Sequence, residues 1–277
     1  MTVHGHQAYG VAVASGRYDD AVADFDAQTP AIARVYDYLL GGKDNFAADR
    51  EVAEKLMAVA PLTVEVTREN RQFLARAVAW AAQHGISQFV DLGCGMPTVP
   101  NTHGTAQQTV PDARVAYVDN DPVVLAHLRA LAAHGNPGVT VVDGNVRQPG
   151  PIVDAVAAGV DLSAPVCLLI GFLLHFFAAG EARDLVARYT AVLAPGSYVV
   201  LSAGRGDSDA ADNGFGAYSS GGIQVHNHSV AGFTSFFGDR ELVPPGVVDS
   251  REWHPGPGQP VHLPPRDGQV IVGVARV

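Results

Sequence analysis

Short apolar runs alternate with amphipathic stretches along the chain from about residue 86 onward. The apolar runs are bounded by turn residues, and they predict β-strands near 87–92, 113–118, 138–143, 165–170 and 197–202. The amphipathic stretches predict helices near 102–110, 122–134, 149–158 and 180–193. Such alternation indicates a parallel sheet with right-handed crossovers. A helix near 226–238 and strands near 240–243 and 269–276 would complete a mostly parallel seven-stranded sheet in a three-layer α/β/α fold.

A helical extension is predicted ahead of this sheet. Thr29-Pro30 has the pattern of a helix start, with Thr29 as N-cap, and this helix would end at Gly41-Gly42. A second helix follows Asn45, and a third runs from near Thr63 to about His84. We therefore expect a tail over 1–28, a helical lid or extension over 29–85, and the core over 86–277.

Periodicity also assigns faces to the first helix and loops to the C-terminal third. Apolar positions 32, 35, 39 and 40 would turn inward and leave Arg34, Asp37 and Lys43 available. The segment 203–222 is predicted as a surface loop, and 244–268 as a long hairpin arm, because both are rich in turn residues.

Composition excludes several classes of protein. The chain has 277 residues, 47% of them apolar and 17% charged, which predicts a globular protein with one elaborated domain. A net charge of −10 and the lack of a basic stripe argue against a nucleic-acid partner. The sequence carries no signal for an oligomeric state.

The run 162–180 contains no Asp, Glu, Lys or Arg and is long enough to raise the question of a membrane span. Pro165, Gly171 and His175 interrupt it, so we interpret it as a buried strand, a loop and a helix start, with no membrane partner. Cys94 and Cys167 fall in predicted core segments, which fits free thiols in a reducing cytoplasm. The first 20 residues lack the basic start and apolar block of a signal peptide.

Two segments carry the strongest functional signal, one over 89–97 (FVDLGCGMP) and one over 115–122 (VAYVDNDP). Gly93 and Gly95 allow the backbone to approach a ligand closely. Asp119 follows Gly95 by 24 positions, close to the roughly 20 at which Rossmann-like folds hold a nucleoside ribose. Asp121, just before Pro122, suits a helix cap better than a ligand contact.

The details of the first segment favour S-adenosylmethionine over a dinucleotide. A dinucleotide fold uses a third glycine and leaves a helix N-terminus free for pyrophosphate, whereas Pro97 stands near that place here. Asp91 precedes the glycines and could either accept a hydrogen bond from the cofactor ammonium or order the turn. A nicotinamide-dependent oxidoreductase is the less favoured reading of the same segments.

The ends of the third and fourth strands supply further candidates. Asp143 and Asn145 compete to receive the adenine amino group, and we favour Asn145, with the amide of Val146 facing the ring. After the fourth strand, Phe172 could face the sulfonium or belong to the core. His175 could be a general base, or a structural histidine in an apolar stretch. The expected cofactor contacts are Asp91, Gly93, Gly95, Asp119, Asn120, Asn145, Val146 and Gly171.

Histidines elsewhere in the chain do not indicate a catalytic or metal site. His103 could approach the cofactor or be exposed. His226 and His228 lack a third ligand at metal spacing, so no metal site is expected.

The joint occurrence of these motifs with two N-terminal ones resembles a known family. The segment 33–50 (ARVYDYLLGGKDNFAADR), Glu69-Asn-Arg71, 91–98 (DLGCGMPT) and 117–122 (YVDNDP) together resemble the actinobacterial S-adenosyl methyltransferases of unassigned substrate, which have a Rossmann-like class I methyltransferase fold. The resemblance covers about residues 25–250. The chain departs from the pattern near Gly104 and at Asn145, where the family usually has acids, and at Ser202-Ala-Gly, where it usually has Ser-His.

The resemblance implies methyl transfer from S-adenosylmethionine to a small-molecule acceptor, and we expect a role in specialised metabolism. By analogy with other small-molecule methyltransferases, the N-terminal helices would cover the cofactor. Lid or substrate candidates are Tyr36, Tyr38, Lys43, Asp44, Asn45, Arg50, His103 and Phe172. The turn at 41–45 could instead only cap two helices. The missing acids leave open a non-catalytic regulator that binds S-adenosylmethionine.

Overall fold

One mixed β-sheet organises the protein. The computed structural model describes residues 26–206, 216–255 and 269–277, so most of the predicted tail over 1–28 lies outside the described residues. The strands are β1 (Gln88–Leu92), β2 (Arg114–Asp119), β3 (Val139–Asp143), β4 (Cys167–Gly171), β5 (Tyr198–Gly204), β6 (Glu241–Leu242), β7 (Val248–Asp249) and β8 (Val270–Arg276).

The strand order is β3–β2–β1–β4–β5–β8–β6, and β7 pairs with β8. Strands β1 to β5 run parallel to one another, whereas β8 runs antiparallel to β5 and β6. All seven predicted strands are present and the predicted fold class is confirmed. The eighth strand, β7, lies inside the segment 244–268 that was predicted as an arm, and 256–268 lies outside the described residues.

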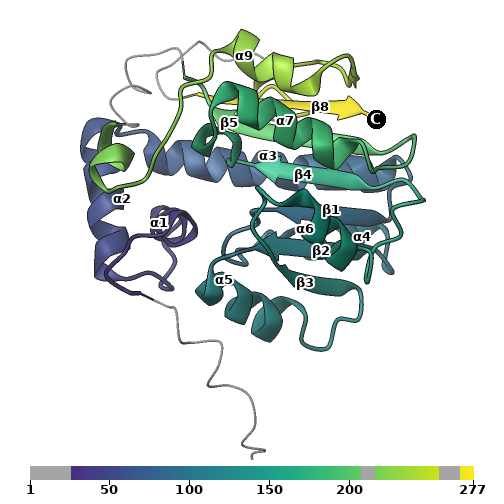
Figure 1. Ribbon diagram of the computed structural model, residues 1–277, viewed down its shortest axis with the longest axis horizontal. Helices are drawn as coiled ribbons and strands as arrows, with labels where there is room; N and C mark the ends of the chain where they lie inside the picture. The colour runs from purple at the N-terminus through teal and green to yellow at the C-terminus, as the bar shows by residue number, and fades with distance from the viewer. Residues whose placement is uncertain (1–25, 207–215, 256–268) are drawn as a thin grey trace, which may run out of the picture.

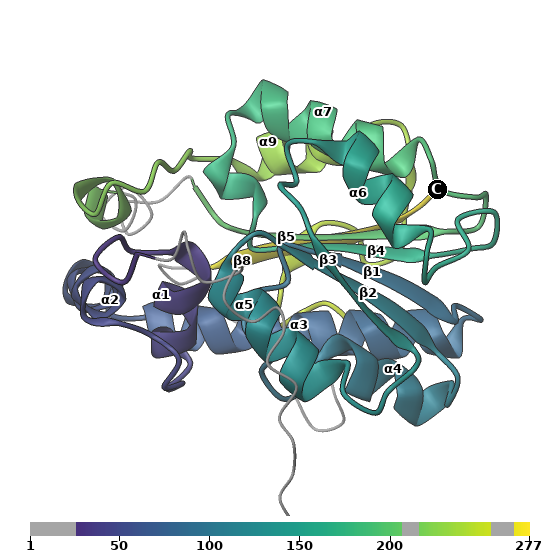
Figure 2. The same cartoon turned by 60° about the horizontal axis from the view of Figure 1, so that its bottom comes forward.

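Helices cover both faces of the sheet (Figures 1 and 2). Figure 2 shows α6, α7 and α9 on one face, α3, α4 and α5 on the other, and α1 and α2 together at one end. Their bounds are α1 (Ile32–Leu39), α2 (Ala47–Val59), α3 (Thr63–Gln83), α4 (Thr102–Thr109), α5 (Pro122–His127), α6 (Pro149–Val156), α7 (Ala179–Thr190) and α9 (Val230–Thr234). Shorter turns of other helix types are η1 (Leu128–Ala132), η2 (Leu174–Phe176) and η3 (Ser235–Phe237).

The core is split into two layers by the sheet, because successive side chains of a strand point to opposite faces. Val90 and Leu92 of β1 belong to the layer under α6 and α7, whereas Phe89 belongs to the layer with α3 and α4. Every residue of β1 is buried, as expected for a central parallel strand covered on both faces. The uncharged run 162–180 is β4, a loop and η2, and no helix in the described ranges is long and apolar enough to cross a membrane.

Several predicted boundaries are wrong in detail. Thr29 does not cap the first helix: its hydroxyl donates to Asp26, and the helix begins after Ala31. The helix predicted over 122–134 changes from α-helical to π-helical hydrogen bonding at Leu128. The helix predicted over 226–238 is shorter and ends as η3. The predicted loop 203–222 begins as the end of β5 and is helical over 216–220, while 207–215 lies outside the described residues.

The first helix also buries polar side chains that were expected to be available. Val35 and Leu39 point inward as predicted, but Ile32 is exposed, and Arg34 and Asp37 are buried. The periodicity of apolar residues does not predict the burial of Arg34 and Asp37. They are buried because α1 packs against α2 and α3 and lines the cavity described below. A buried charge is stable only when it is paired, and both residues have partners.

Candidate functional site

A cavity of about 590 Å³ lies at the carboxyl ends of the parallel strands. The strand order reverses between β1 and β4, and ligands of open α/β sheets bind in the crevice at such a switch point. Residues after β1, β2, β3 and β4 line the cavity, and α1, α3 and the segment 222–224 contribute the rest of the wall. The cavity contains these sequence-predicted residues: Tyr36, Asp91, Gly93, Gly95, Asp119, Asn120, Asn145, Val146, Gly171 and Phe172.

The glycine turn after β1 has the conformation that its sequence predicts. Gly93 and Gly95 have φ values of +62° and +66°, where a side chain is strained. A Cβ on Gly93 would lie 2.9 Å from Leu173, so this glycine is needed for internal packing. A Cβ on Gly95 would meet no atom within 4 Å and would instead occupy space beside the cavity. Gly95 is therefore the position at which a ligand can approach the backbone.

Asp119 connects this turn to the end of β2. One carboxylate oxygen accepts a hydrogen bond from the Gly95 amide at 2.9 Å, and the other accepts from the amides of Asn120 and Asp121 at 2.8 and 3.0 Å. A carboxylate offers about four acceptor positions, so Oδ2 retains one for a ligand hydroxyl. Burial raises the pKa of Asp119, and the three amide donors oppose that shift.

Asp91 and Arg71 line the same cavity as Asp119. The Asp91 carboxylate accepts a hydrogen bond from the Thr102 hydroxyl at 2.7 Å, and burial raises its pKa to about 6. Arg71, from α3, donates to the Met96 carbonyl at 3.1 Å, and its guanidinium lies 6.0 Å from the Tyr36 ring centroid. Its Nε is buried and has no hydrogen-bond partner in the part of the chain that the structure describes.

Arg71 was not among the predicted site residues, although Glu69-Asn-Arg71 was recognised as a family segment. Helical periodicity does not identify Arg71 as a site residue, because it is one arginine on a long amphipathic helix. Its buried Nε and its place in the cavity wall now make it a candidate to bind an anionic group.

The end of β3 supplies the polar rim. The Asn145 side-chain oxygen accepts from the Arg147 amide at 3.0 Å, and Asn145 lines the cavity together with Val146. Asp143, the competing candidate, is exposed and does not line the cavity. The Arg147 guanidinium is held by Glu181 at 2.8 Å and by the Phe176 carbonyl, and it stacks over the Phe177 ring.

The end of β4 is strained. Phe172 has φ +52°, a left-handed conformation that is rare for a bulky residue and costs about 1–3 kcal/mol. Its amide donates to both the carbonyl and the hydroxyl of Ser202 at 3.0 Å, which holds the backbone in this conformation. Its ring meets the Tyr36 ring edge-on at a centroid distance of 6.1 Å. Strain at a cavity wall is a feature of functional sites.

His175 lies behind this wall rather than in it. It is buried, its ring contacts those of Phe172 and Phe176, and it does not line the cavity. Burial lowers its pKa to about 3, so the imidazole is neutral at physiological pH. This surrounding favours the structural interpretation of His175, and the role of general base stays an untested prediction.

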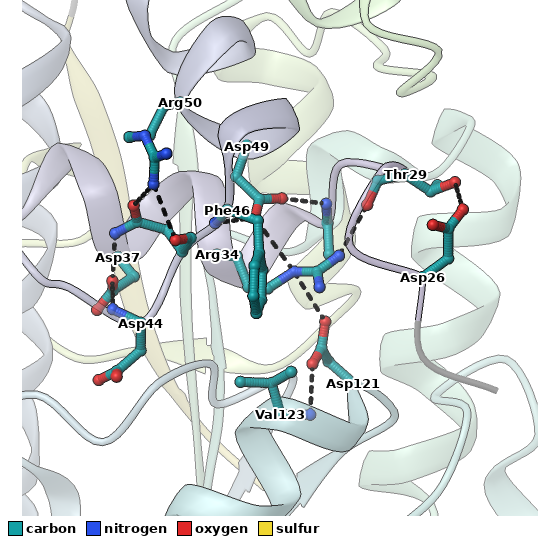
Figure 3. Close-up of polar contacts among 12 residues, drawn as sticks. Asp26, Thr29, Arg34, Asp37, Asp44, Phe46, Asp49, Arg50, Asp121 and Val123 are labelled. Atoms are coloured by element: carbon teal, nitrogen blue, oxygen red, sulfur yellow. Dashed lines mark hydrogen bonds and ion pairs between the residues drawn. The ribbon is translucent and has the colours of Figure 1, made fainter. Parts of the chain in front are cut away.

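Most of the other lid candidates hold the turn between α1 and α2 (Figure 3). Asp37 accepts from the Asp44 amide at 3.0 Å and from the Asn45 side chain at 2.9 Å, and Arg50 donates to the Asn45 carbonyl at 3.0 Å. A Cβ on Gly42 would lie 2.0 Å from the Asp37 carboxylate, which explains the second glycine of the turn. These contacts match the capping interpretation of this turn.

Four further candidates also lie outside the cavity wall. Tyr38 donates to Glu54, and Lys43 is exposed. Asp44 forms an ion pair with His127 of α5 at 3.2 Å. His103 contacts the Tyr117 hydroxyl through both its amide and its ring at 2.9 Å. His228, considered for metal binding, contacts the Leu174 carbonyl, and no group of three potential metal ligands occurs in the described ranges.

One buried arginine joins helices α1 and α2 to the loop after β2. Arg34 of α1 lies 3.4 Å from Asp49 of α2 and 3.6 Å from Asp121, and it donates to the Thr29 carbonyl (Figure 3). Asp121 uses its other oxygen to cap α5 through the Val123 amide, as predicted for this residue. Since the Asp121 amide also donates to Asp119, α1 is connected through Asp121 to the Asp119 carboxylate.

Comparisons with known proteins agree with this geometry. The family model of S-adenosyl methyltransferases matches residues 19–277. The crystal structure of a candidate methyltransferase from Thermobifida fusca is 39% identical, with 94% of this chain and 99% of that chain covered and a TM-score of 0.85. A DUF574 family protein from Streptomyces avermitilis is 34% identical, with coverage of 91% and 98% and a TM-score of 0.85. No curated protein matches.

The match over nearly the whole chain supports neither a nicotinamide-dependent oxidoreductase nor a non-catalytic regulator. The cofactor predicted from the glycine turn and Asp119 is the one that the family uses. The chain belongs to the S-adenosyl methyltransferase family and is an S-adenosylmethionine-dependent methyltransferase.

Proposed function

We propose that this enzyme methylates a small-molecule acceptor inside the cavity at the switch point of the sheet. The supporting observation is that one wall combines an open glycine turn, the Asp119 carboxylate and the buried Nε of Arg71. A cavity of about 590 Å³ is in the size range of small-ligand sites. The net charge of −10 disfavours nucleic acid as the acceptor.

The cavity residues fit the parts of S-adenosylmethionine, and when bound that cofactor supplies a methyl group already activated on a sulfonium. Asp119 would accept a ribose hydroxyl at Oδ2, and Gly95 would leave room for the ligand. Asn145 and Val146 would face the adenine. Arg71 would pair with the carboxylate of the amino-acid end, and Asp91 would accept from its ammonium.

Arg71 and Asp91 carry charges opposite to those of the carboxylate and the ammonium at the amino-acid end of the cofactor. Each ligand charge would meet one protein charge, so neither is left unpaired on burial. The burial that raises the pKa of Asp91 would then be offset by a bound ammonium, which favours the ionised carboxylate.

The residues of the cavity mainly align the reactants and exclude water. Alignment of a reacting pair can lower a barrier by roughly 7–11 kcal/mol. Tyr36 and Phe172 line the cavity at the end of β4, and their rings meet edge-on at a centroid distance of 6.1 Å. The described lining contains no imidazole, which supports a mechanism that depends on alignment more than on a histidine base.

Two measurements test this proposal. Isothermal titration calorimetry with S-adenosylmethionine should show one site per chain, and NAD should not bind. Incubation with a low-molecular-weight bacterial extract should then release S-adenosylhomocysteine in proportion to a methylated small molecule. Release only with a protein or nucleic-acid fraction would refute the small-molecule acceptor.

A further inference from the structure

A buried hydrogen-bond chain fixes the aromatic wall at the end of β4. The Ser202 hydroxyl accepts from the Phe172 amide at 3.0 Å and donates to the Asn70 side-chain oxygen at 2.6 Å. The Asn70 amide then donates to the Tyr36 hydroxyl at 2.9 Å, and that hydroxyl donates to the Thr67 carbonyl at 3.0 Å. Ser202, Asn70 and Tyr36 each accept one of these hydrogen bonds and donate the next, so the orientation of the Asn70 amide group is determined.

This chain connects three layers of the protein. It joins the ends of β4 and β5 to α3 and then to α1 of the lid. Asn70 and Ser202 are buried, and burial also raises the pKa of the Tyr36 phenol. Breaking one link would leave a buried polar group without its partner, at a cost of about 1–3 kcal/mol. The chain therefore sets where the Tyr36 and Phe172 rings stand.

Most of the lining around these rings is uncharged. Some residues of the cavity lining are not assigned to the cofactor. Among them are aromatic rings, an aliphatic side chain and two side-chain amides: Tyr36, Asn70, Phe172, Phe176, Ile223 and Gln224. Two guanidiniums lie nearby. That of Arg71, 6.0 Å from the Tyr36 ring centroid, is assigned to the cofactor carboxylate by the proposed function, and that of Arg147 is held by Glu181 and the Phe176 carbonyl. A charged acceptor placed here would lose its hydration without gaining an opposite charge.

We propose that the methyl acceptor is an uncharged, aromatic or otherwise flat apolar molecule that binds against the Tyr36 and Phe172 rings, and that Asn70 and Ser202 are positioning residues for this subsite. The proposal rests on the proposed function, because it assumes that Asp119, Gly95 and Arg71 hold the cofactor. Aromatic contacts of this kind prefer offset or edge-on geometry, as the two rings already adopt with each other.

Calorimetry with paired probes tests the proposal. The protein is first titrated with S-adenosylhomocysteine, and the complex is then titrated with 2-naphthol and with 2-naphthoate, which share one ring system and differ in charge. We expect 2-naphthol to bind at least about tenfold more tightly than 2-naphthoate. Equal binding, tighter binding of 2-naphthoate, or binding of neither probe would overturn the uncharged subsite. Failure of S-adenosylhomocysteine to bind would instead overturn the proposed function and this proposal with it.

Three variants separate the subsite from general stability. Phe172→Gly suits the backbone at φ +52° but removes the ring, so 2-naphthol affinity should fall by about tenfold while S-adenosylhomocysteine affinity changes little. Tyr36→Phe keeps the ring and removes the hydroxyl that connects Asn70 to the Thr67 carbonyl. This variant should bind 2-naphthol several-fold more weakly. Tyr38→Phe, whose hydroxyl binds Glu54 outside the cavity, is the matched control and should change neither affinity. Equal effects of the two tyrosine variants would overturn the positioning role of the chain.

Discussion

Asp121→Asn is the most informative single substitution for the coupling between the predicted lid, helices α1 and α2, and the proposed cofactor site. Asp121 uses one oxygen to cap α5 through the Val123 and Val124 amides and the other to face Arg34 at 3.6 Å. Asparagine is also a good N-cap, so the variant keeps the cap and loses only the charge. The expected result is faster release of S-adenosylmethionine with little loss of thermal stability.

The magnitude follows from the position of the ion pair. Side-chain exposures of 4% for Arg34 and 10% for Asp121 place the pair away from bulk water. At 3.6 Å the attraction is roughly 4–5 kcal/mol for an effective dielectric constant of about 20, before desolvation is subtracted. Asp49 remains 3.4 Å from Arg34 in the variant, so its charge still has a partner. We expect about 1–2 kcal/mol less lid stabilisation, which corresponds to roughly five- to thirtyfold faster cofactor release.

Stopped-flow displacement of S-adenosylmethionine measures this rate, and differential scanning calorimetry of the ligand-free protein measures stability. Asp121→Ala is the matched comparison, because it removes the cap as well and should cost about 1 kcal/mol of stability in addition. An unchanged release rate in Asp121→Asn would show that the lid is not held through this pair. Equal destabilisation by both variants would show that the charge acts on folding rather than on the lid.

Further predictions concern the three charged residues of the cofactor wall. Asp119→Ala should weaken S-adenosylmethionine about 10- to 100-fold by calorimetry, because it removes the ribose acceptor and frees the Gly95 amide; unchanged affinity would remove Asp119 from the site. Arg71→Leu should weaken S-adenosylmethionine about tenfold or more but leave 5′-methylthioadenosine, which lacks the amino-acid end, nearly unchanged; parallel losses would refute the carboxylate role. Affinity for S-adenosylmethionine should fall as the pH drops below about 6, because the raised pKa of Asp91 makes its carboxylate protonate there and lose the ammonium. Asp91→Asn should abolish that pH dependence, and a persistent pH dependence would assign it to another group.

The sheet was predictable from sequence because its central strands are uniform apolar runs. Gly93, Gly95 and Asp119 were predictable for a related reason, since each follows such a run where backbone geometry restricts residue type. Helix boundaries were predicted wrongly where tertiary contacts override the local capping preference. Thr29 has a favourable capping residue type, yet the helix starts after Ala31, whose amide is bound by the Asp49 side chain.

The polar residues of α1 and α3 could not be placed from the sequence. The helical periodicity predicts that Arg34 and Asp37 are exposed. They are buried because Arg34 pairs with Asp49 and Asp121, and Asp37 accepts a hydrogen bond from the Asp44 amide. Asn70 and Arg71 are adjacent on α3, and their side chains are held by hydrogen bonds to the distant Ser202 and Met96. Local patterns contain no information about such long-range partners.

The most direct test of the whole account is a crystal structure of the protein with S-adenosylhomocysteine. We expect a ribose hydroxyl within hydrogen-bond distance of Asp119 Oδ2, the ligand passing Gly95, and its carboxylate paired with Arg71. A nucleoside bound elsewhere, or bound in this cavity with Asp119 and Arg71 both unengaged, would contradict the account.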